Sequence, residues 1–193
     1  PCPSCLSNLK HAGKRMENPD FRARVNELLD NPAAETLPEV PSVMQGIASC
    51  RSAADIAANV CKPLKGLKIA AYYGCLMSRP AGLMQFGDPE NPTLMESLLA
   101  ACGAEMVDFP LKTECCGASF GIPERPMTAI NSGRILEVAS NMGVDAIVEI
   151  GPGKALSGFV KKTVPGIPVC AVETAADVEN LPDTLEQLIK EKA

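Results

Sequence analysis

Three cysteines carry the most chemistry in this chain. Cys75 is followed, after 39 intervening residues, by the tripeptide Cys115-Cys116-Gly117. Neighbouring side chains point apart along the backbone, so a disulfide between Cys115 and Cys116 would be strained. Thiolates are soft ligands that select iron–sulfur clusters, zinc or Cu(I), and Gly117 has no side chain to crowd a bulky inorganic core. The pattern therefore indicates metal ligation, with an iron–sulfur cluster as the candidate cofactor.

The segments around these cysteines resemble a known family. The motifs that carry the resemblance are Tyr72-Tyr73-Gly74-Cys75-Leu76 with Arg79-Pro80, Asp88-Pro89-Glu90-Asn91-Pro92, Met95-Glu96, and Thr113-Glu114-Cys115-Cys116-Gly117-Ala118. Together they are similar to the second cysteine-rich CCG domain in the B subunit of heterodisulfide reductase. The resemblance covers about residues 1–148, and Cys2-Pro3-Ser4-Cys5 resembles the closing Cys-x-x-Cys of a first such domain.

The resemblance implies an oxidoreductase in which an unusual noncubane 4Fe–4S cluster delivers electrons to a disulfide, such as that of coenzyme M and coenzyme B. It implies a complex with proteins like the A and C subunits of heterodisulfide reductase. The motif assigns as catalytic residues and cluster ligands Cys75, Cys115 and Cys116, and as neighbours of the cofactor Gly117, Tyr73 and Arg79. Cys2 and Cys5 have ligand spacing, but a lone Cys-x-x-Cys is a weak signal, so they rank behind these.

The chain departs from the family at one place. A closing Cys-x-x-Cys is expected near positions 151 and 154, where the sequence is Gly151-Pro152-Gly153-Lys154. Residues 143–158 resemble instead the C-terminal segment of malonyl-CoA:acyl-carrier-protein transacylase, whose serine and histidine have no match here, so we expect no transacylase activity. We interpret the chain as a fragment or a chimera with a junction near residues 143–151. The glycine-rich tripeptide before a helix could bind an anion, although a tight turn is the simpler interpretation.

The missing pair keeps a second interpretation open. In it the chain is a non-catalytic α/β domain whose three thiols bind zinc or a partial cluster weakly, or bind nothing. A tetrahedral zinc ion needs a fourth ligand, which Cys2 or Cys5 would have to supply. A brown colour after anaerobic purification favours the redox interpretation, whereas a colourless protein favours the other.

Composition limits the classes of function. The chain has 193 residues, a formal net charge of -5 and scattered basic residues, which argues against nucleic-acid binding. It contains neither a stretch of about 20 apolar residues nor a signal peptide. Nine cysteines without an export signal suggest a reducing cytoplasm. Four of them, Cys50, Cys61, Cys102 and Cys170, stand within or beside apolar runs, and we interpret them as buried small hydrophobes.

The elements that must position the site alternate along the chain. We expect a helical remnant of a first CCG domain and a proline-rich linker in residues 1–41, the CCG-type domain in 42–150, and a transacylase-like strand and helices in 151–193. Strands are predicted at 67–73, 105–109, 146–150 and 167–172, with helices at 21–29, 52–61, from 91 to before 103, 125–141 and 154–162. This alternation predicts an α/β fold: a three-layer, Rossmann-like parallel sheet with helices on both faces. The three cysteines would then follow the carboxyl ends of strands.

Overall fold

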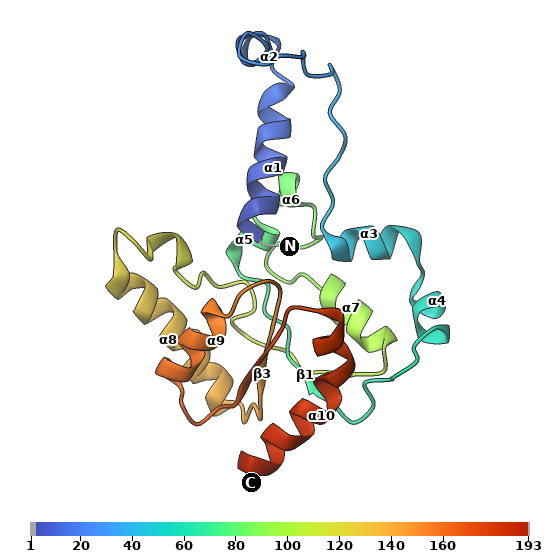
Figure 1. Ribbon diagram of the computed structural model, residues 1–193, viewed down its shortest axis with the longest axis vertical. Helices are drawn as coiled ribbons and strands as arrows, with labels where there is room; N and C mark the ends of the chain where they lie inside the picture. The colour runs from blue at the N-terminus through green and yellow to red at the C-terminus, as the bar shows by residue number, and fades with distance from the viewer. Residues whose placement is uncertain (1–2, 193) are drawn as a thin grey trace. The chain divides into compact units, whose positions relative to one another are not determined.

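The computed structural model describes residues 3–192 (Figure 1). The chain divides into two compact units, one ending at Thr113 and one beginning at Glu114. Among the described residues, the first unit holds α1–α7 with strands β1 and β2. The second holds the 3-10 helix η1, helices α8–α10 and strands β3 and β4.

Seven helices form most of the first unit. Their bounds are α1 (Pro3–Met16), α2 (Pro19–Asn26), α3 (Val43–Cys50), α4 (Ala53–Ala58), α5 (Cys75–Ser78), α6 (Ala81–Met84) and α7 (Leu94–Ala101). Ser42 and Ser52 open α3 and α4 with capping boxes, in which Gln45 and Asp55 bond back to the serine amides. The start at Ser52 agrees with the sequence prediction. The helix predicted to start at residue 91 starts later, because α7 begins at Leu94 with Thr93 as its N-cap residue.

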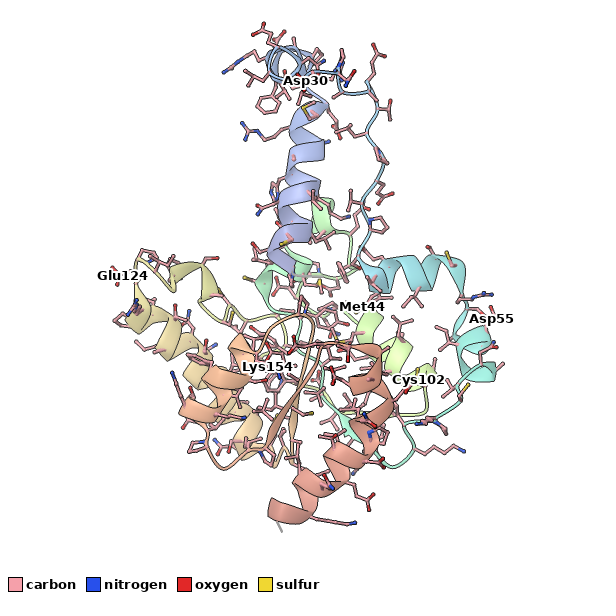
Figure 2. The ribbon with its side chains drawn as sticks, viewed as in Figure 1. Asp30, Met44, Asp55, Cys102, Glu124 and Lys154 are labelled. Atoms are coloured by element: carbon pink, nitrogen blue, oxygen red, sulfur yellow. The ribbon has the colours of Figure 1, made fainter. Side chains whose placement is uncertain are left out.

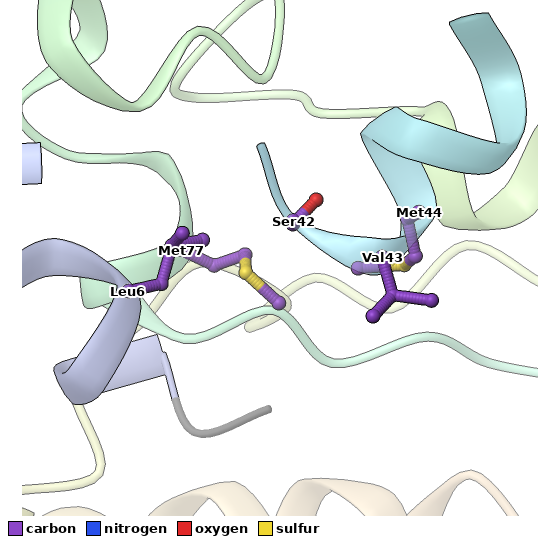
Figure 3. A pocket seen from close by; sticks show the side chains of 5 residues that line it. All are labelled: Leu6, Ser42, Val43, Met44 and Met77. Carbon is purple, nitrogen blue, oxygen red and sulfur yellow. The ribbon is translucent and has the colours of Figure 1, made fainter. Parts of the chain in front are cut away.

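The core of the first unit lies where α1 meets the segment around Cys75. Its buried side chains are Leu6, Ala71, Tyr73, Met84 and Phe86, and α1 contacts both α5 and α6. A small apolar pocket beside this core is lined by Leu6, Ser42, Val43, Met44 and Met77 (Figure 3). The N-terminal helix therefore buries its apolar side against the turn that carries Cys75.

The predicted three-layer, Rossmann-like sheet is wrong. In the described residues there are instead two separate two-stranded sheets. In the first unit β1 (Lys68–Ile69) runs parallel to β2 (Glu105–Met106), with Lys68 opposite Glu105. In the second unit β3 (Ile147–Ile150) runs parallel to β4 (Val169–Val172), with Ile147 opposite Val169. Parallel pairing was predicted correctly, but no strand joins the two pairs into one sheet within residues 3–192.

Hydrogen bonding explains why the first sheet stops so early. The run Leu67–Tyr73 leaves the ladder after Ile69, and the amides of Tyr73 and Gly74 donate instead to the carbonyl of Lys112, at 2.8 and 3.0 Å. The opposite segment contains Pro110, which has no N–H to give to a ladder. Ala71 and Tyr73 enter the helix-lined core. The predicted strand is therefore too long, and the predicted burial holds for Ala71 and Tyr73 but not for the exposed Lys68, Ala70 and Tyr72.

The second unit is built around β3 and β4. Its helical elements are η1 (Ala118–Phe120), α8 (Arg125–Asn141), α9 (Ala155–Thr163) and α10 (Ala175–Lys192). α9 and α10 both contact β4, and α8 contacts η1 and α9. The bounds of α8 agree with the prediction, as does the succession of a strand between two helices in the tail. Among the described residues, none of the helices combines the length and the apolar character needed to cross a membrane.

Candidate metal centre

Cys75 begins a short helix after a tight turn. Gly74, its N-cap residue, has φ +68°, a left-handed conformation that favours glycine. A Cβ atom at Gly74 would lie 3.3 Å from the hydroxyl oxygen of Tyr72. The half-buried Cys75 accepts a hydrogen bond at its carbonyl from the amide of Arg79, at 3.0 Å. The turn therefore has a defined backbone conformation that begins one residue before the thiol.

Tyr73 is a core residue whose hydroxyl is fully engaged by protein groups. Its ring is 4% exposed and packs edge-to-face against Phe86. The hydroxyl donates to the carboxylate of Glu96 and accepts from the amide of Met95 at 2.7 Å. Burial raises the pKa of Tyr73 well above its ordinary value, and the hydrogen bond to Glu96 raises it further. Both the ring and the hydroxyl of Tyr73 are therefore fixed by neighbouring residues, directly before the turn that carries Cys75.

Arg79 connects the Cys75 helix to the end of the first unit. Its guanidinium donates to Glu90 at 2.7 Å and to the carbonyl of Thr113 at 3.2 Å. The hydroxyl of Ser78, in the same helix as Cys75, is buried and has no hydrogen-bond partner among the described residues. Buried polar groups seldom lack a partner, so Ser78 is a donor available to a bound group.

The Cys115-Cys116-Gly117 loop is held by contacts with α8, the helix that follows it in the sequence. Gly117 has φ +78°, and a Cβ atom there would lie 2.8 Å from the Cα of Thr128. The hydroxyl of Thr128 donates to the Gly117 carbonyl at 2.7 Å, and that of Ser132 donates to the Cys116 carbonyl at 2.6 Å. Gly117 is thus needed for a left-handed backbone and a close helix, a more direct reason than space for a cofactor.

The sulfur of Cys115 already accepts a hydrogen bond. The amide of Gly117 lies 3.3 Å from it, and bonds of this kind to sulfur help to set the potential of a cluster. A small pocket beside the loop is lined by Glu114, Cys115, Asn131, Arg134 and Ile135. Arg134 and Glu114 form an ion pair across it at 3.1 Å. One cysteine of the loop therefore faces a polar recess.

The segment where the family pattern expects two more cysteines has another structure. Gly151 and Gly153 have φ +135° and +95°, values that L-residues with side chains rarely adopt. The amide of Gly153 donates to Glu173 at 3.1 Å, and Lys154 pairs with Glu173 at 3.7 Å (Figure 2 labels Lys154). The expected cysteine is absent at position 151, and a cysteine placed there would have a strained backbone.

The possible anion site at this loop is closed by a carboxylate of the chain itself. Glu149 accepts from the hydroxyl and amide of Ser157, at 2.5 and 2.7 Å, and from the amide of Leu156 at 3.1 Å. Burial alone would raise the pKa of Glu149, but these hydrogen bonds lower it below its usual value. The amides at the start of α9 already bind an anion, which supports the interpretation of a turn.

The structure places the predicted ligands in different parts of the chain. Cys75 lies in the first unit, and Cys115 and Cys116 lie in the second. Cys2 is outside the described residues, and Cys5 is exposed on α1. Among residues 3–192 there is no group of three or more histidine, cysteine, aspartate or glutamate side chains arranged to hold a metal. Thiolates are nevertheless the soft ligands that iron–sulfur clusters take.

Some sequence interpretations need correction. Cys50 and Cys61 are exposed and so are not buried hydrophobes, whereas Cys102, at the end of α7, and Cys170 are half-buried (Figure 2 labels Cys102). Burial raises the pKa of the Cys170 thiol. Thr128 and Ser132 were missed, although their spacing of four residues places them on one face of a helix and so could have indicated a shared contact.

Comparisons with known proteins identify the family of the chain. Residues 69–153 match the family CCG, described as a cysteine-rich domain. The chain is 30% identical over 158 residues to the B subunit of the ferredoxin/F(420)H(2)-dependent CoB-CoM heterodisulfide reductase of Methanosarcina acetivorans, covering 78% of this chain and 52% of that protein. It is 28% identical over 149 residues to the 8-methylmenaquinol:fumarate reductase membrane anchor subunit of Wolinella succinogenes, covering 76% of this chain and 51% of that protein.

A third relative has the same extent of similarity. The B subunit of the ferredoxin:CoB-CoM heterodisulfide reductase of Methanosarcina mazei is 29% identical over 158 residues, covering 78% of this chain and 52% of that protein. The chain thus spans about half the length of these curated relatives. It contains a cysteine-rich CCG domain and is a homologue of the B subunit of heterodisulfide reductase.

Proposed function

We propose that this chain is an iron–sulfur redox protein similar to the B subunit of heterodisulfide reductase, in which Cys75, Cys115 and Cys116 ligate a noncubane 4Fe–4S cluster. The observation that carries the proposal is the occurrence of these thiols, in family order, within the matched residues 69–153. A bound cluster would supply single electrons for cleavage of a small-molecule disulfide. The protein would work in the cytoplasm with partners like the A and C subunits of heterodisulfide reductase.

Hydrogen bonds within the first unit hold the backbone directly before Cys75. The carbonyl of Lys112 bonds to the amides of Tyr73 and Gly74, directly before Cys75. The order of the three thiols along the chain, which is that of the family motif, supports their assignment to one cluster. Gly117, Tyr73 and Arg79 would border that site, and Cys2 or Cys5 would complete it only if the N-terminal segment approaches.

Two further expectations go with this proposal. The chain would be divided functionally at residues 1–41, 42–150 and 151–193, and the last segment would be a transacylase-like addition without transacylase activity. The replacement of the closing Cys-x-x-Cys by a loop with Gly151 and Gly153 at positive φ would leave the cluster with an incomplete protein ligand set.

Anaerobic reconstitution tests the proposal directly. Protein incubated with iron and sulfide should become brown and bind both elements, whereas Cys75→Ser, Cys115→Ser and Cys116→Ser should each lose most of the iron. Cys102→Ser and Cys50→Ser serve as controls and should keep it, because both cysteines lie outside the motif. Iron and zinc per chain are measured together. A colourless protein with stoichiometric zinc would favour the non-catalytic alternative, and unchanged iron in the loop variants would remove the ligand assignment.

A further inference from the structure

Lys112 is a buried lysine in the loop that follows β2. Its residue exposure is 8%, although lysine is seldom fully buried unless it is paired. Its ammonium lies 3.2 Å from a carboxylate oxygen of Glu96 and 3.8 Å from one of Asp108. The Glu96 side chain is 18% exposed, whereas that of Asp108 is 86% exposed. The interaction with Glu96 is therefore the desolvated one.

A buried ion pair of this kind is a poor source of stability. The desolvation of two charges offsets most of their attraction, and an apolar pair of similar volume often does as well. What such a pair can add is geometry, because both partners need their hydrogen bonds satisfied in fixed directions.

The groups that Lys112 and Glu96 orient belong to the turn before Cys75. Glu96 accepts the hydroxyl proton of Tyr73 in a hydrogen bond, and the Tyr73 oxygen accepts from the Met95 amide. The carbonyl of Lys112 accepts from the amides of Tyr73 and Gly74. Lys112 thus holds the two residues before Cys75 twice, by its carbonyl directly and by its ammonium through Glu96. Gly74 is left-handed, so the turn has little freedom once these bonds form.

We propose that Lys112 and Glu96 are positioning residues that hold the Cys75 turn in its ligand conformation. The inference rests on the proposed function in taking Cys75 as a cluster ligand. It adds two residues that act through others and touch no metal.

The turn can be tested in metal-free protein by amide hydrogen exchange. In Lys112→Met the amides of Tyr73 and Gly74 should exchange about tenfold faster or more. The substitution removes the charged hydrogen bond from the Lys112 ammonium to Glu96, so the turn should open locally more often. Protection in α1 and α7 should stay within about twofold, since global unfolding is a separate event. Lys112→Arg should restore most of the protection. Lys68→Met is the matched control: it removes an exposed ion pair to Glu105 in the same unit.

A second variant covers the case in which Lys112→Met does not fold. Glu96→Gln keeps the shape and an acceptor for Tyr73 but removes the charge, so it should show the same local acceleration to a smaller extent. If both variants exchange uniformly faster throughout the first unit, the pair has only a structural role and the inference is overturned. Unchanged exchange at Tyr73 and Gly74 would overturn it too.

Iron binding after reconstitution then tests whether the turn matters for the cluster. Lys112→Met should bind at least about threefold less iron than wild type, and Lys112→Arg and Lys68→Met should bind as much as wild type. A wild-type protein that binds no iron contradicts the proposed function, and the exchange data then decide the inference about the turn. A wild-type protein that binds iron, with undiminished iron in Lys112→Met, contradicts the positioning role alone.

Discussion

The two cysteine segments are held in their conformations by different means. In the first unit the turn before Cys75 is held by a buried network of Tyr73, Glu96 and Lys112. In the second unit the Cys115–Gly117 loop is held by hydroxyls of α8 that donate to its carbonyls. One segment depends on side chains that are charged and desolvated, and the other on neutral hydrogen bonds and on the absence of a Cβ at Gly117.

This difference has a consequence for how each segment tolerates change. Removing one member of a charged buried network leaves its partner without compensation, which is costly and depends on the charge state. Removing one hydroxyl from the second segment takes away a single neutral hydrogen bond to a carbonyl. A methyl group added at Gly117, in contrast, would clash with the backbone of α8. The first segment should therefore be sensitive to lost charge, and the second to added volume.

Among the substitutions that test this difference, Gly117→Ala should have the largest effect on the free energy of unfolding. The new Cβ would lie 2.8 Å from the Cα of Thr128, in a residue with φ +78°, so strain and overpacking should together lower the free energy of unfolding by about 2–4 kcal/mol. The chain has no tryptophan, so urea unfolding is followed by far-ultraviolet circular dichroism.

Two glycines of the same unit separate the causes. Gly143→Ala keeps a positive φ of +76° with nothing within 4 Å of the new Cβ, so it should cost only about 1–2 kcal/mol. Gly133→Ala, inside α8 and also in open space, should stabilise the helix by about 1 kcal/mol. If Gly117→Ala costs no more than Gly143→Ala, close packing against α8 does not hold the loop.

How far the sequence predicts the structure differs between these segments. The motif around Gly117 signals a special backbone position, and the bounds predicted for α8 agree with the structure. The Lys112 network carries no such signal, because Glu96 and Lys112 are 16 residues apart and look like ordinary surface charges in a sequence. Partners that meet only through tertiary packing are not visible in local patterns.

The fold prediction failed for a related reason. Periodicity cannot distinguish an apolar run that lies in a sheet from one that leaves it after two residues, and Tyr73 is buried by α1 and α6 side chains such as Leu6 and Met84. The four segments predicted as strands do contain β1–β4. The amides of Tyr73 and Gly74, at the end of the first of these segments, donate to the Lys112 carbonyl outside the two-residue ladder.

Glu149→Gln extends the comparison to the loop that replaces the expected Cys-x-x-Cys. Glu149 receives three hydrogen bonds at the start of α9, so at neutral pH the substitution should lower the free energy of unfolding by about 1–3 kcal/mol. The pKa of Glu149 is lower in the folded protein than its usual 4.5. The stabilisation is therefore present above that usual value and is lost as the pH falls through the folded-state pKa.

Urea unfolding of both proteins between pH 3 and pH 7 measures this dependence. The difference between wild type and Glu149→Gln should narrow on the acid side, where the carboxyl of Glu149 is protonated. Ser157→Ala should cost about 1 kcal/mol with a similar pH dependence, because its hydroxyl donates to the same carboxylate. A difference that stays constant over the whole range would mean that the Glu149 charge does not hold this turn.

The smallest effects should come from one serine in each cysteine segment, and they should differ in sign. Ser132 donates to the Cys116 carbonyl at 2.6 Å, so Ser132→Ala should lower the free energy of unfolding by about 1 kcal/mol. Ser78 lies in the Cys75 helix with its hydroxyl buried and without a partner among the described residues, so Ser78→Ala should be neutral or stabilising by up to about 1 kcal/mol in metal-free protein. Reconstituted protein gives a second measurement. If the Ser78 hydroxyl donates a hydrogen bond to a bound cluster, Ser78→Ala should bind less iron or show an altered spectrum, although its metal-free polypeptide is no less stable. A destabilised metal-free Ser78→Ala would mean that the hydroxyl already has a partner, and the Cys75 helix would then offer no free donor to a cofactor.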